Sequence, residues 1–373
     1  MRSPDCITRI DTTVVDLPLA RPAVNSARVP IRNVGCVLVQ VHTARGATGE
    51  GMLYTMRARH IAPLRSMIDS LAELLIGQDA SRPERMWESL WKEIYFFGFT
   101  GVSVMAISAL DTAVWDVHAR SIDQPLATLW GRHHAEHVPA YASHGLWTDQ
   151  SPDALAREAE SYVRAGWRAM KMRIGRPERG ADAAAARAIR EAIGGDIVLM
   201  ADCSRALDVP RAIALARELE PWRLGWFEEP LPAHDLQGIA RVRAAISTPV
   251  AIGENDYTRY GFRRIAEAGA ADVWMLDLAR VGGLSEMRKV AAMARALDIP
   301  VSNHIFTEHS IAACSTFSNL NFVEYIDWFE ELFGEPLRLV DGMLEVPSGP
   351  GHGFRFDPRT IEKRRVGAPE TAR

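Results

Sequence analysis

From residue 138 to residue 325, short apolar runs alternate with segments whose apolar residues recur at helical spacing. Each run has the length of a strand, and every run but the last leads into a predicted helix. The predicted strands span 138–142, 168–173, 197–202, 223–228, 248–253, 272–277, 299–303 and 321–325. This alternation implies parallel strands joined by right-handed crossovers. Eight such strands can close a barrel whose site lies at their carboxyl ends.

The helices between these strands have recognisable starts and stops. In the first, Ser151 is a predicted N-cap, Pro152 takes the first helical position, and Gly166 ends the helix. The predicted helices span 152–165, 182–193, 209–220, 234–245, 259–269, 283–297 and 308–318.

The chain on either side of the barrel has a different pattern. Residues 7–17, 34–43 and 49–51 predict a small antiparallel sheet, and the following residues predict three helices over 61–76, 83–91 and 103–120. We therefore expect an α+β domain over 1–130, a barrel over 131–330, and a Pro- and Gly-rich tail over 331–373 that packs back on the first domain.

Composition excludes several kinds of partner. A chain of 373 residues is too long for one ordinary core, and its net charge of −4 gives no reason to expect nucleic acid or an anionic membrane. Its four cysteines are widely spaced, and the N-terminus lacks the order of a signal peptide. Since no apolar run reaches the roughly 18–20 residues that span a bilayer, we expect a cytoplasmic protein.

Three carboxylates follow three successive predicted strands: Asp202, Glu228 and Glu254. Since the strand ends meet at one end of a barrel, these carboxylates should converge. Converging carboxylates repel one another unless a cation lies between them, and oxygen ligands favour a hard ion, Mg²⁺ first. The alternative is three unrelated capping or surface carboxylates, which their common place in the barrel disfavours.

A second group of polar residues ends other strands. His304 and Asp277 end neighbouring strands, so Asp277 can fix one imidazole nitrogen and leave the other as a proton acceptor. A structural histidine is the alternative. Lys171 and Arg173 lie two residues apart and should both face the barrel interior, where an anionic ligand would balance them. Glu324 ends the last strand and could hold a proton and donate a hydrogen bond.

One reaction uses all of these groups. The α-proton of a carboxylate is weakly acidic, because its removal creates a doubly negative enediolate. A divalent metal, a lysine and a hydrogen-bond donor on the carboxylate oxygens stabilise that charge where it develops. A base beside the α-carbon then takes the proton.

At these residues the chain resembles the enolase superfamily, and within it the mandelate racemase subgroup. The resemblance covers nearly the whole chain and implies a modified TIM-type barrel with an α+β capping domain that the tail completes. It is carried by Lys171-Met-Arg-Ile-Gly175, Asp202 with Leu207-Asp-Val-Pro210, Trp226-Phe-Glu-Glu-Pro230, Gly253-Glu-Asn255, Asp277 ahead of Gly282-Gly283, Asn303-His-Ile-Phe306 and Glu324.

The resemblance also implies a role for each matching residue. The three carboxylates would be the Mg²⁺ ligands, with Glu228 rather than Glu229 as the ligand of its pair. His304 with Asp277 would be the general base and acid of one face. The substrate carboxylate would contact Lys171 and Glu324 from opposite sides. Capping loops near residues 24–27 and Tyr54 would close over the substrate.

One position departs from the family pattern. The second-face base is often the second lysine of a Lys-x-Lys pair, and here Arg173 stands in its place. Guanidinium stays protonated at any ordinary pH, so it is a poor base. One-base chemistry is then favoured: His304 removes the α-proton of a sugar acid and a β-hydroxyl leaves, which gives a 2-keto-3-deoxy acid. Polar residues near the mouth suit such a substrate: Asn25, Ser143, His144, Asn255 and Asp327.

Three other functions stay open at this point. The first is a racemase or epimerase of a 2-hydroxy or amino acid, which needs a second base not identified here. The second is a carboxylate-binding protein without activity, which the His304–Asp277 pair argues against. The third is a metal-independent Schiff-base aldolase that uses Lys171. The resemblance further implies a small-molecule carboxylate as partner and a homo-oligomer.

Overall fold

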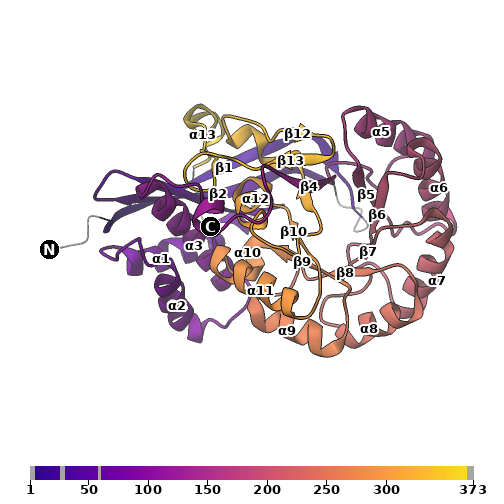
Figure 1. Ribbon diagram of the computed structural model, residues 1–373, viewed down its shortest axis with the longest axis horizontal. Coiled ribbons are helices and arrows are strands. Elements are labelled where there is room, and N and C mark those ends of the chain that lie inside the picture. Colours follow the sequence, from indigo (N-terminus) through magenta and orange to yellow (C-terminus); the bar gives the residue numbers. More distant parts are fainter. Residues whose placement is uncertain (1–4, 26–29, 58–59, 368–373) are drawn as a thin grey trace, which may run out of the picture.

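The structure, a computed structural model, describes residues 5–25, 30–57 and 60–367. It consists of an α+β domain and a barrel packed side by side, with the tail in contact with both (Figure 1). Within the described ranges, no helix is long and apolar enough to cross a membrane. Of the predicted capping loop at 24–27, Ser26 and Ala27 lie outside the described residues.

The capping domain begins with three antiparallel strands in the order β1-β2-β3. They are β1 (Ile7–Ala23), β2 (Ile31–Thr43) and β3 (Thr48–Thr55). The helical elements that follow are α1 (Ile61–Ala72), η2 (Glu73–Leu75), α2 (Pro83–Glu93), η3 (Ile94–Phe96), α3 (Val102–Ser121) and α4 (Leu126–Leu129). The predicted sheet and its three helices are confirmed, although β1 runs six residues further than predicted.

Helix α3 lies directly on strand β3, and glycine makes this close approach possible. A Cβ atom at Gly51 would come within 2.3 Å of the backbone oxygen of Ala109, and one at Gly49 within 2.2 Å of that of Ala113. The Gly49-Glu50-Gly51 sequence therefore sets how near the helix packs to the sheet.

The eight predicted barrel strands are all present and parallel. They are β4 (His137–Ala142), β5 (Ala169–Arg173), β6 (Val198–Asp202), β7 (Phe227–Glu228), β8 (Val250–Ile252), β9 (Val273–Asp277), β10 (Val301–His304) and β11 (Val323–Tyr325). Strands β4 to β10 pair in chain order, and β11 pairs with β4. The chain just before β11 closes the ring, since the Asn321 N–H donates to the Val301 carbonyl at 2.8 Å.

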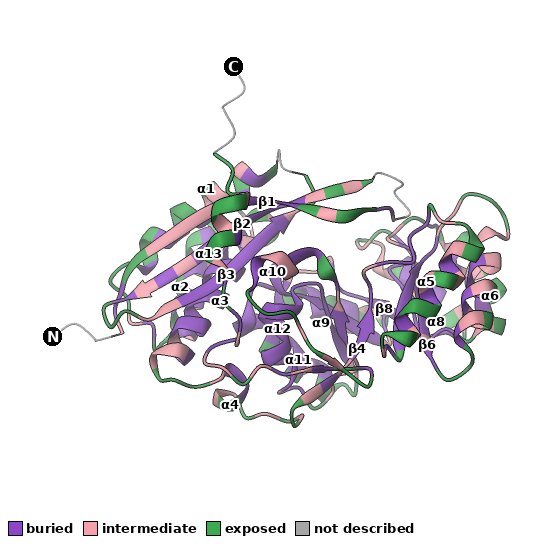
Figure 2. Ribbon diagram, turned by 90° about the horizontal axis from the view of Figure 1, so that it is seen from above, coloured by how far each residue is buried: buried purple, intermediate pink, exposed green. Residues whose placement is uncertain are grey.

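Helices surround these strands on the outside, with α5 to α9 forming an arc (Figure 1). They are α5 (Pro152–Arg164), α6 (Ala181–Ile193), α7 (Val209–Leu219), η4 (Glu220–Trp222), α8 (Leu236–Ala245), α9 (Thr258–Ala268), α10 (Leu278–Val281), α11 (Leu284–Ala296) and α12 (Thr307–Cys314). The Ser151 side chain accepts from the Ala154 N–H at 3.3 Å, as an N-cap does. Buried strands lie inside helices whose outer faces are exposed (Figure 2).

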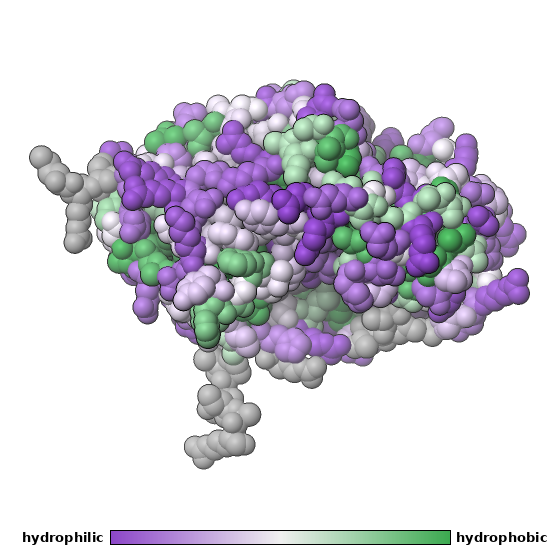
Figure 3. All heavy atoms as spheres, turned by 90° about the horizontal axis from the view of Figure 1, so that it is seen from below, coloured by the Kyte–Doolittle hydropathy of each residue, from purple (hydrophilic) through white to green (hydrophobic). Residues whose placement is uncertain are grey.

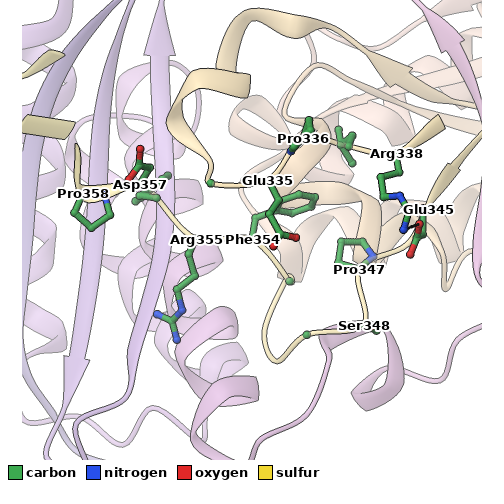
Figure 4. Close-up of a pocket in the computed structure, with 15 residues that line it drawn as sticks. Glu335, Pro336, Arg338, Glu345, Pro347, Ser348, Phe354, Arg355, Asp357 and Pro358 are labelled. Atoms are coloured by element: carbon green, nitrogen blue, oxygen red, sulfur yellow. Dashed lines mark ion pairs between the residues drawn. The ribbon is translucent and has the colours of Figure 1, made fainter. Parts of the chain in front are cut away.

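The tail contacts both parts of the molecule. Its elements are η5 (Asp327–Leu332), β12 (Leu339–Val340), β13 (Met343–Glu345) and α13 (Pro358–Arg364). Strand β13 pairs antiparallel with β4 of the barrel, whereas the Phe356 N–H donates to Glu50 of the capping sheet at 2.8 Å. A cavity of about 650 Å³ lies within the tail between Glu335, Pro347 and Phe354 (Figure 4). Glu345, which also lines it, pairs with His137 at the amino end of β4. The division at residues 130 and 330 stays a prediction.

Candidate active site

The polar strand ends lie at one level because the parallel register aligns them. Asp202 is opposite Arg173 on one side and Glu228 on the other, and His304 is opposite Asp277. Several loops that leave these strand ends hold non-glycine residues at positive φ: Leu146, Ser204, Arg205, Glu229, Ile305 and Phe306. Strained backbone conformations of this kind are common at functional sites, where particular groups must be held in fixed orientations. Their presence is a separate indication that this end of the barrel is a functional site.

Each predicted metal ligand is buried and contacts a cation of the chain itself. Glu228 Oε1 is 2.6 Å from Lys171 Nζ, and Asp202 Oδ2 is 3.4 Å from Arg173 Nε. Glu254 Oε1 is 3.1 Å from Arg205 Nη1. Within the described part of the chain, no group of three or more Asp, Glu, His or Cys side chains is arranged to hold a metal ion.

The chemistry of these three carboxylates nevertheless fits Mg²⁺. They supply only oxygen ligands, which this ion prefers. Burial raises the pKa of Glu228 and Lys171 lowers it, but the nearby Asp202 and Glu254 raise it again, so the net shift is upward. The carboxylates therefore repel one another across the space between their strand ends. A divalent cation would relieve this repulsion.

The His304 imidazole lies between two carboxylates. Its Nδ1 is 2.7 Å from Asp277 Oδ2, and its Nε2 is 3.2 Å from Glu254 Oε2. Burial lowers the pKa of His304, but Glu254 and Asp277 outweigh burial and raise it to about 9. The structure thus brings together the predicted pair. The largest upward contribution to the pKa comes from Glu254, a predicted metal ligand whose charge a bound cation would offset.

Lys171 and Glu324 meet on the other side of the site. Lys171 Nζ is 2.9 Å from Glu324 Oε1, which also accepts from the Ser143 hydroxyl at 2.5 Å. The other oxygen, Oε2, accepts from the Ile305 N–H at 2.7 Å. Burial raises the pKa of Glu324, but Lys171 and His304 dominate and hold it well below its usual range. The sequence predicted that Glu324 could hold a proton, and that stays a prediction; in the structure Lys171 and these donors favour its charged form.

Arg173 is buried beside Asp202 and under the Trp147 ring, whose centroid is 4.8 Å from the guanidinium carbon. Its Nη2 donates to the Ser143 hydroxyl at 3.0 Å. Its Nη1 is buried with no hydrogen-bond partner among the described residues. Arg173 is thus a fixed cation with one donor still available to a ligand.

Sequence reasoning missed three residues that organise the site. Arg205 contacts Glu254, and Glu229 accepts from the Gly253 N–H at 3.1 Å, next to that same ligand. Arg280 Nη1 is 3.1 Å from Asp277 Oδ2. Arg205 follows Asp202 by three residues, and Arg280 follows Asp277 by three, so this spacing could have pointed to both arginines. No comparable spacing pointed to Glu229.

Two of the predicted polar residues near the mouth lie in the site, whereas one does not. Ser143 contacts Glu324 and Arg173, and Asn255 Nδ2 is 3.2 Å from Glu254 Oε1. His144 instead packs outside the barrel against the Tyr162 and Tyr325 rings, and burial lowers its pKa to about 4.

Comparison with known proteins agrees with the fold: the chain belongs to the enolase superfamily. Residues 154–360 match the enolase C-terminal domain-like family. Residues 9–131 match the mandelate racemase / muconate lactonizing enzyme N-terminal domain, which places the chain in that subgroup.

Its relatives include enzymes that act on sugar acids. The chain is 31% identical to 3,6-anhydro-alpha-L-galactonate cycloisomerase of Streptomyces coelicolor, over 97% of this chain and 100% of that protein. It is 29% identical to L-talarate/galactarate dehydratase of Salmonella typhimurium, over 94% of this chain and 89% of that protein.

Solved structures with bound magnesium have the same fold. A racemase from Streptomyces coelicolor with bound magnesium superposes with a TM-score of 0.92 at 31% identity, covering 96% of this chain and 100% of that one. L-Talarate dehydratase from Polaromonas sp. JS666, complexed with Mg and L-glucarate, gives 0.91 at 29% identity, covering 97% and 98%.

Proposed function

We propose that this protein is a Mg²⁺-dependent sugar-acid dehydratase. It would remove the α-proton of a hydroxylated carboxylate through an enediolate and release the β-hydroxyl as water, leaving a 2-keto-3-deoxy acid. The observation that carries this choice is the contrast between the two faces of the site. One face has the His304–Asp277 pair, and the other has Arg173, which cannot serve as a base.

Each residue would have one task. Asp202, Glu228 and Glu254 would hold the ion, which when bound supplies Lewis-acid stabilisation of the substrate carboxylate. Lys171 would add a positive charge at that carboxylate, and its contact with the ionised Glu324 keeps it in place. Glu324 would act as an acceptor that positions Lys171, because its Oε1 lies 2.9 Å from Lys171 Nζ.

The proton path would involve one histidine. His304 Nε2 would take the α-proton while Asp277 holds Nδ1. The bond from the β-carbon to its hydroxyl would then break, and the proton on His304 would pass to the departing oxygen, forming water. The resulting enol would rearrange to the 2-keto acid. Arg173 would use its available Nη1 to bind an oxygen of the substrate.

Incubation with a library of sugar acids in D₂O and Mg²⁺ tests the proposal. We expect a keto acid, detected as its semicarbazone, and loss of activity in excess chelator. Deuterium at the α-carbon with inversion and without loss of water would contradict dehydration and indicate a racemase or epimerase. Full activity in chelator would indicate the metal-independent aldolase.

An isomerase is the second candidate, because two relatives are named cycloisomerases. We further propose that the physiological partner is a small carboxylate, that the protein is cytoplasmic, and that it forms a homo-oligomer. The division into domains at residues 130 and 330 belongs to the same proposal.

A further inference from the structure

The Glu158 carboxylate on α5 is buried, although it is not one of the site residues. Hydrophilic side chains cover much of the face seen in Figure 3, whereas the Glu158 side chain is only 10% exposed. Its Oε2 accepts from the Leu146 N–H at 3.2 Å and from Gln150 Nε2 at 2.9 Å. Its Oε1 accepts from the Tyr162 hydroxyl at 2.7 Å. Glu158 therefore fastens the chain between β4 and α5, which we call the β4–α5 loop (residues 143–151), to helix α5.

The cation paired with this carboxylate comes from the capping domain. Arg21, near the end of β1, forms an ion pair with Glu158, and its Nη2 also donates to the His144 carbonyl at 3.2 Å. Just beyond β1, the Val24 carbonyl accepts from the Thr148 N–H at 3.0 Å and from its hydroxyl at 2.9 Å. In Figure 2, β1 extends from the capping sheet toward the part of the barrel that carries α5. The end of the cap strand thus contacts the β4–α5 loop at two places.

Gly145 leaves the space in which these groups meet. A Cβ atom at this position would overlap Arg21 Nη2, Glu158 Oε1 and the Tyr162 hydroxyl. The Gly145 backbone lies outside the left-handed region, so a larger residue would be excluded by these side chains rather than by backbone strain. The contact between the cap and the loop therefore depends on a residue without a side chain.

The β4–α5 loop in turn packs on Arg173. The Leu146 carbonyl accepts from the Arg173 N–H at 3.0 Å, and the Trp147 ring lies over the guanidinium. The Trp147 N–H donates to Gln150 Oε1 at 3.0 Å, and the amide of Gln150 donates to Glu158. Contacts therefore run without a break from the end of β1, through Glu158, to the ring that packs on Arg173.

Resting on the proposed function, in which Arg173 binds an oxygen of the substrate, we propose that Arg21 is a positioning residue for Arg173. Removal of one member of a buried ion pair leaves the other charge without compensation. Without Arg21, the Glu158 carboxylate would regain hydration by turning toward solvent, which would release Leu146 and Gln150. The ring that packs on Arg173 would then shift, and the guanidinium would lose its fixed orientation.

Replacement by a neutral side chain, Arg21→Met, tests the role on the sugar acid that the library identifies. We expect KM to rise roughly tenfold, as loss of one hydrogen bond to a charged group would give, with kcat changed less than about threefold. Arg21→Lys should recover part of the loss, because it restores a positive charge beside Glu158. Arg9→Met is the matched control, since Arg9 is an exposed arginine of the same strand, paired with Asp11 at 3.1 Å. A KM within about twofold of wild type in Arg21→Met, or a loss confined to kcat, would overturn the proposal.

Gly145→Ala tests the same contact without removing a charge. The added methyl group would exclude the Arg21 guanidinium from Glu158, so we expect KM to rise as in Arg21→Met while kcat is kept. A wild-type KM in Gly145→Ala would show that substrate binding does not depend on this contact, and would also overturn the proposal.

A readout that needs no turnover separates this inference from the proposed function. The Arg173 Nε–H resonance, identified by its absence in Arg173→Lys, senses the ring current of Trp147, whose centroid lies 4.8 Å from the guanidinium carbon. It should shift in Arg21→Met and Gly145→Ala and stay as in wild type in Arg9→Met. If no sugar acid is turned over but this resonance shifts, the proposed function fails and the positioning role stands. An unchanged resonance in Arg21→Met would reject the positioning role whatever the reaction.

Discussion

His304 is the residue on which the proposed chemistry depends, and its partners allow a clean test. His304→Asn should reduce turnover on the order of 10³-fold, because no proton acceptor of suitable pKa replaces the imidazole. The three predicted metal ligands remain, so Mg²⁺ affinity measured by calorimetry should stay within a few-fold of wild type. Retention of most activity would show that another group is the base.

Arg173 decides between one-base and two-base chemistry. In Arg173→Lys, the shorter side chain carries an amine that, unlike guanidinium, can lose its proton and act as a base. We expect α-proton exchange with D₂O to appear on the second face, with slower dehydration, since the bond to Ser143 Oγ is lost. Nuclear magnetic resonance of recovered substrate measures this exchange. Unchanged exchange in the variant would show that residue 173 does not reach the α-carbon.

The residues differ in how far the sequence could reveal them. Asp202, Glu228 and Asp277 close apolar strands, and parallel register then brings them together, so pattern alone places them. Glu229 could not be identified as a support of Glu254, because that depends on a loop conformation with φ of 42°. The contacts of Glu324 could not be predicted for a similar reason: its partners Ser143, Lys171 and Ile305 come from three separate parts of the barrel.

At the scale of elements, hydrophobic periodicity predicted every barrel strand but not its length. Strands β7 and β8 span two and three residues where about six were predicted, mainly because they begin later than predicted, at Phe227 and Val250. Helix α10 has only four residues, too few to show a helical period.

The contact between β3 and α3 gives an element-scale prediction. Gly51→Ala would place a methyl group 2.3 Å from the Ala109 oxygen, so the helix must move away from the sheet. We expect a loss of about 1–3 kcal/mol in the free energy of unfolding, measured in urea. Gly334→Ala is the control, because nothing lies within 4 Å of its Cβ position. Equal stability of both variants would contradict the close packing.

At the scale of the whole molecule, a buried carboxyl joins the capping domain to the barrel. Asp111 on α3 accepts from the Ser285 N–H at 2.8 Å and from its hydroxyl at 2.7 Å. Burial raises the pKa of Asp111 from 3.8 to about 7, although these hydrogen bonds lower it. A raised pKa means that the folded protein binds the proton more tightly than the unfolded chain does.

The stability that Asp111 contributes is therefore present below about pH 3.8 and is lost as pH rises through 7. The Asp111→Asn variant keeps the shape of the side chain but cannot bind or release a proton. Relative to wild type, we expect the variant to gain up to about 4 kcal/mol between pH 4 and pH 7, measured as the difference in unfolding free energy. A difference that does not vary with pH would show that Asp111 is not protonated in the fold.

The bond between Phe356 and Glu50 joins residues 306 positions apart in the chain. During synthesis at ~5–20 residues per second, the capping sheet would wait roughly 15–60 s for the segment that pairs its buried carboxylate. Until then the Glu50 carboxylate has only the hydrogen bond from Gln40, so the first domain to leave the ribosome is among the last to be completed. Termination just after the barrel would yield a chain with its eight barrel strands and site residues present but without β12, β13 and the segment that completes the cap.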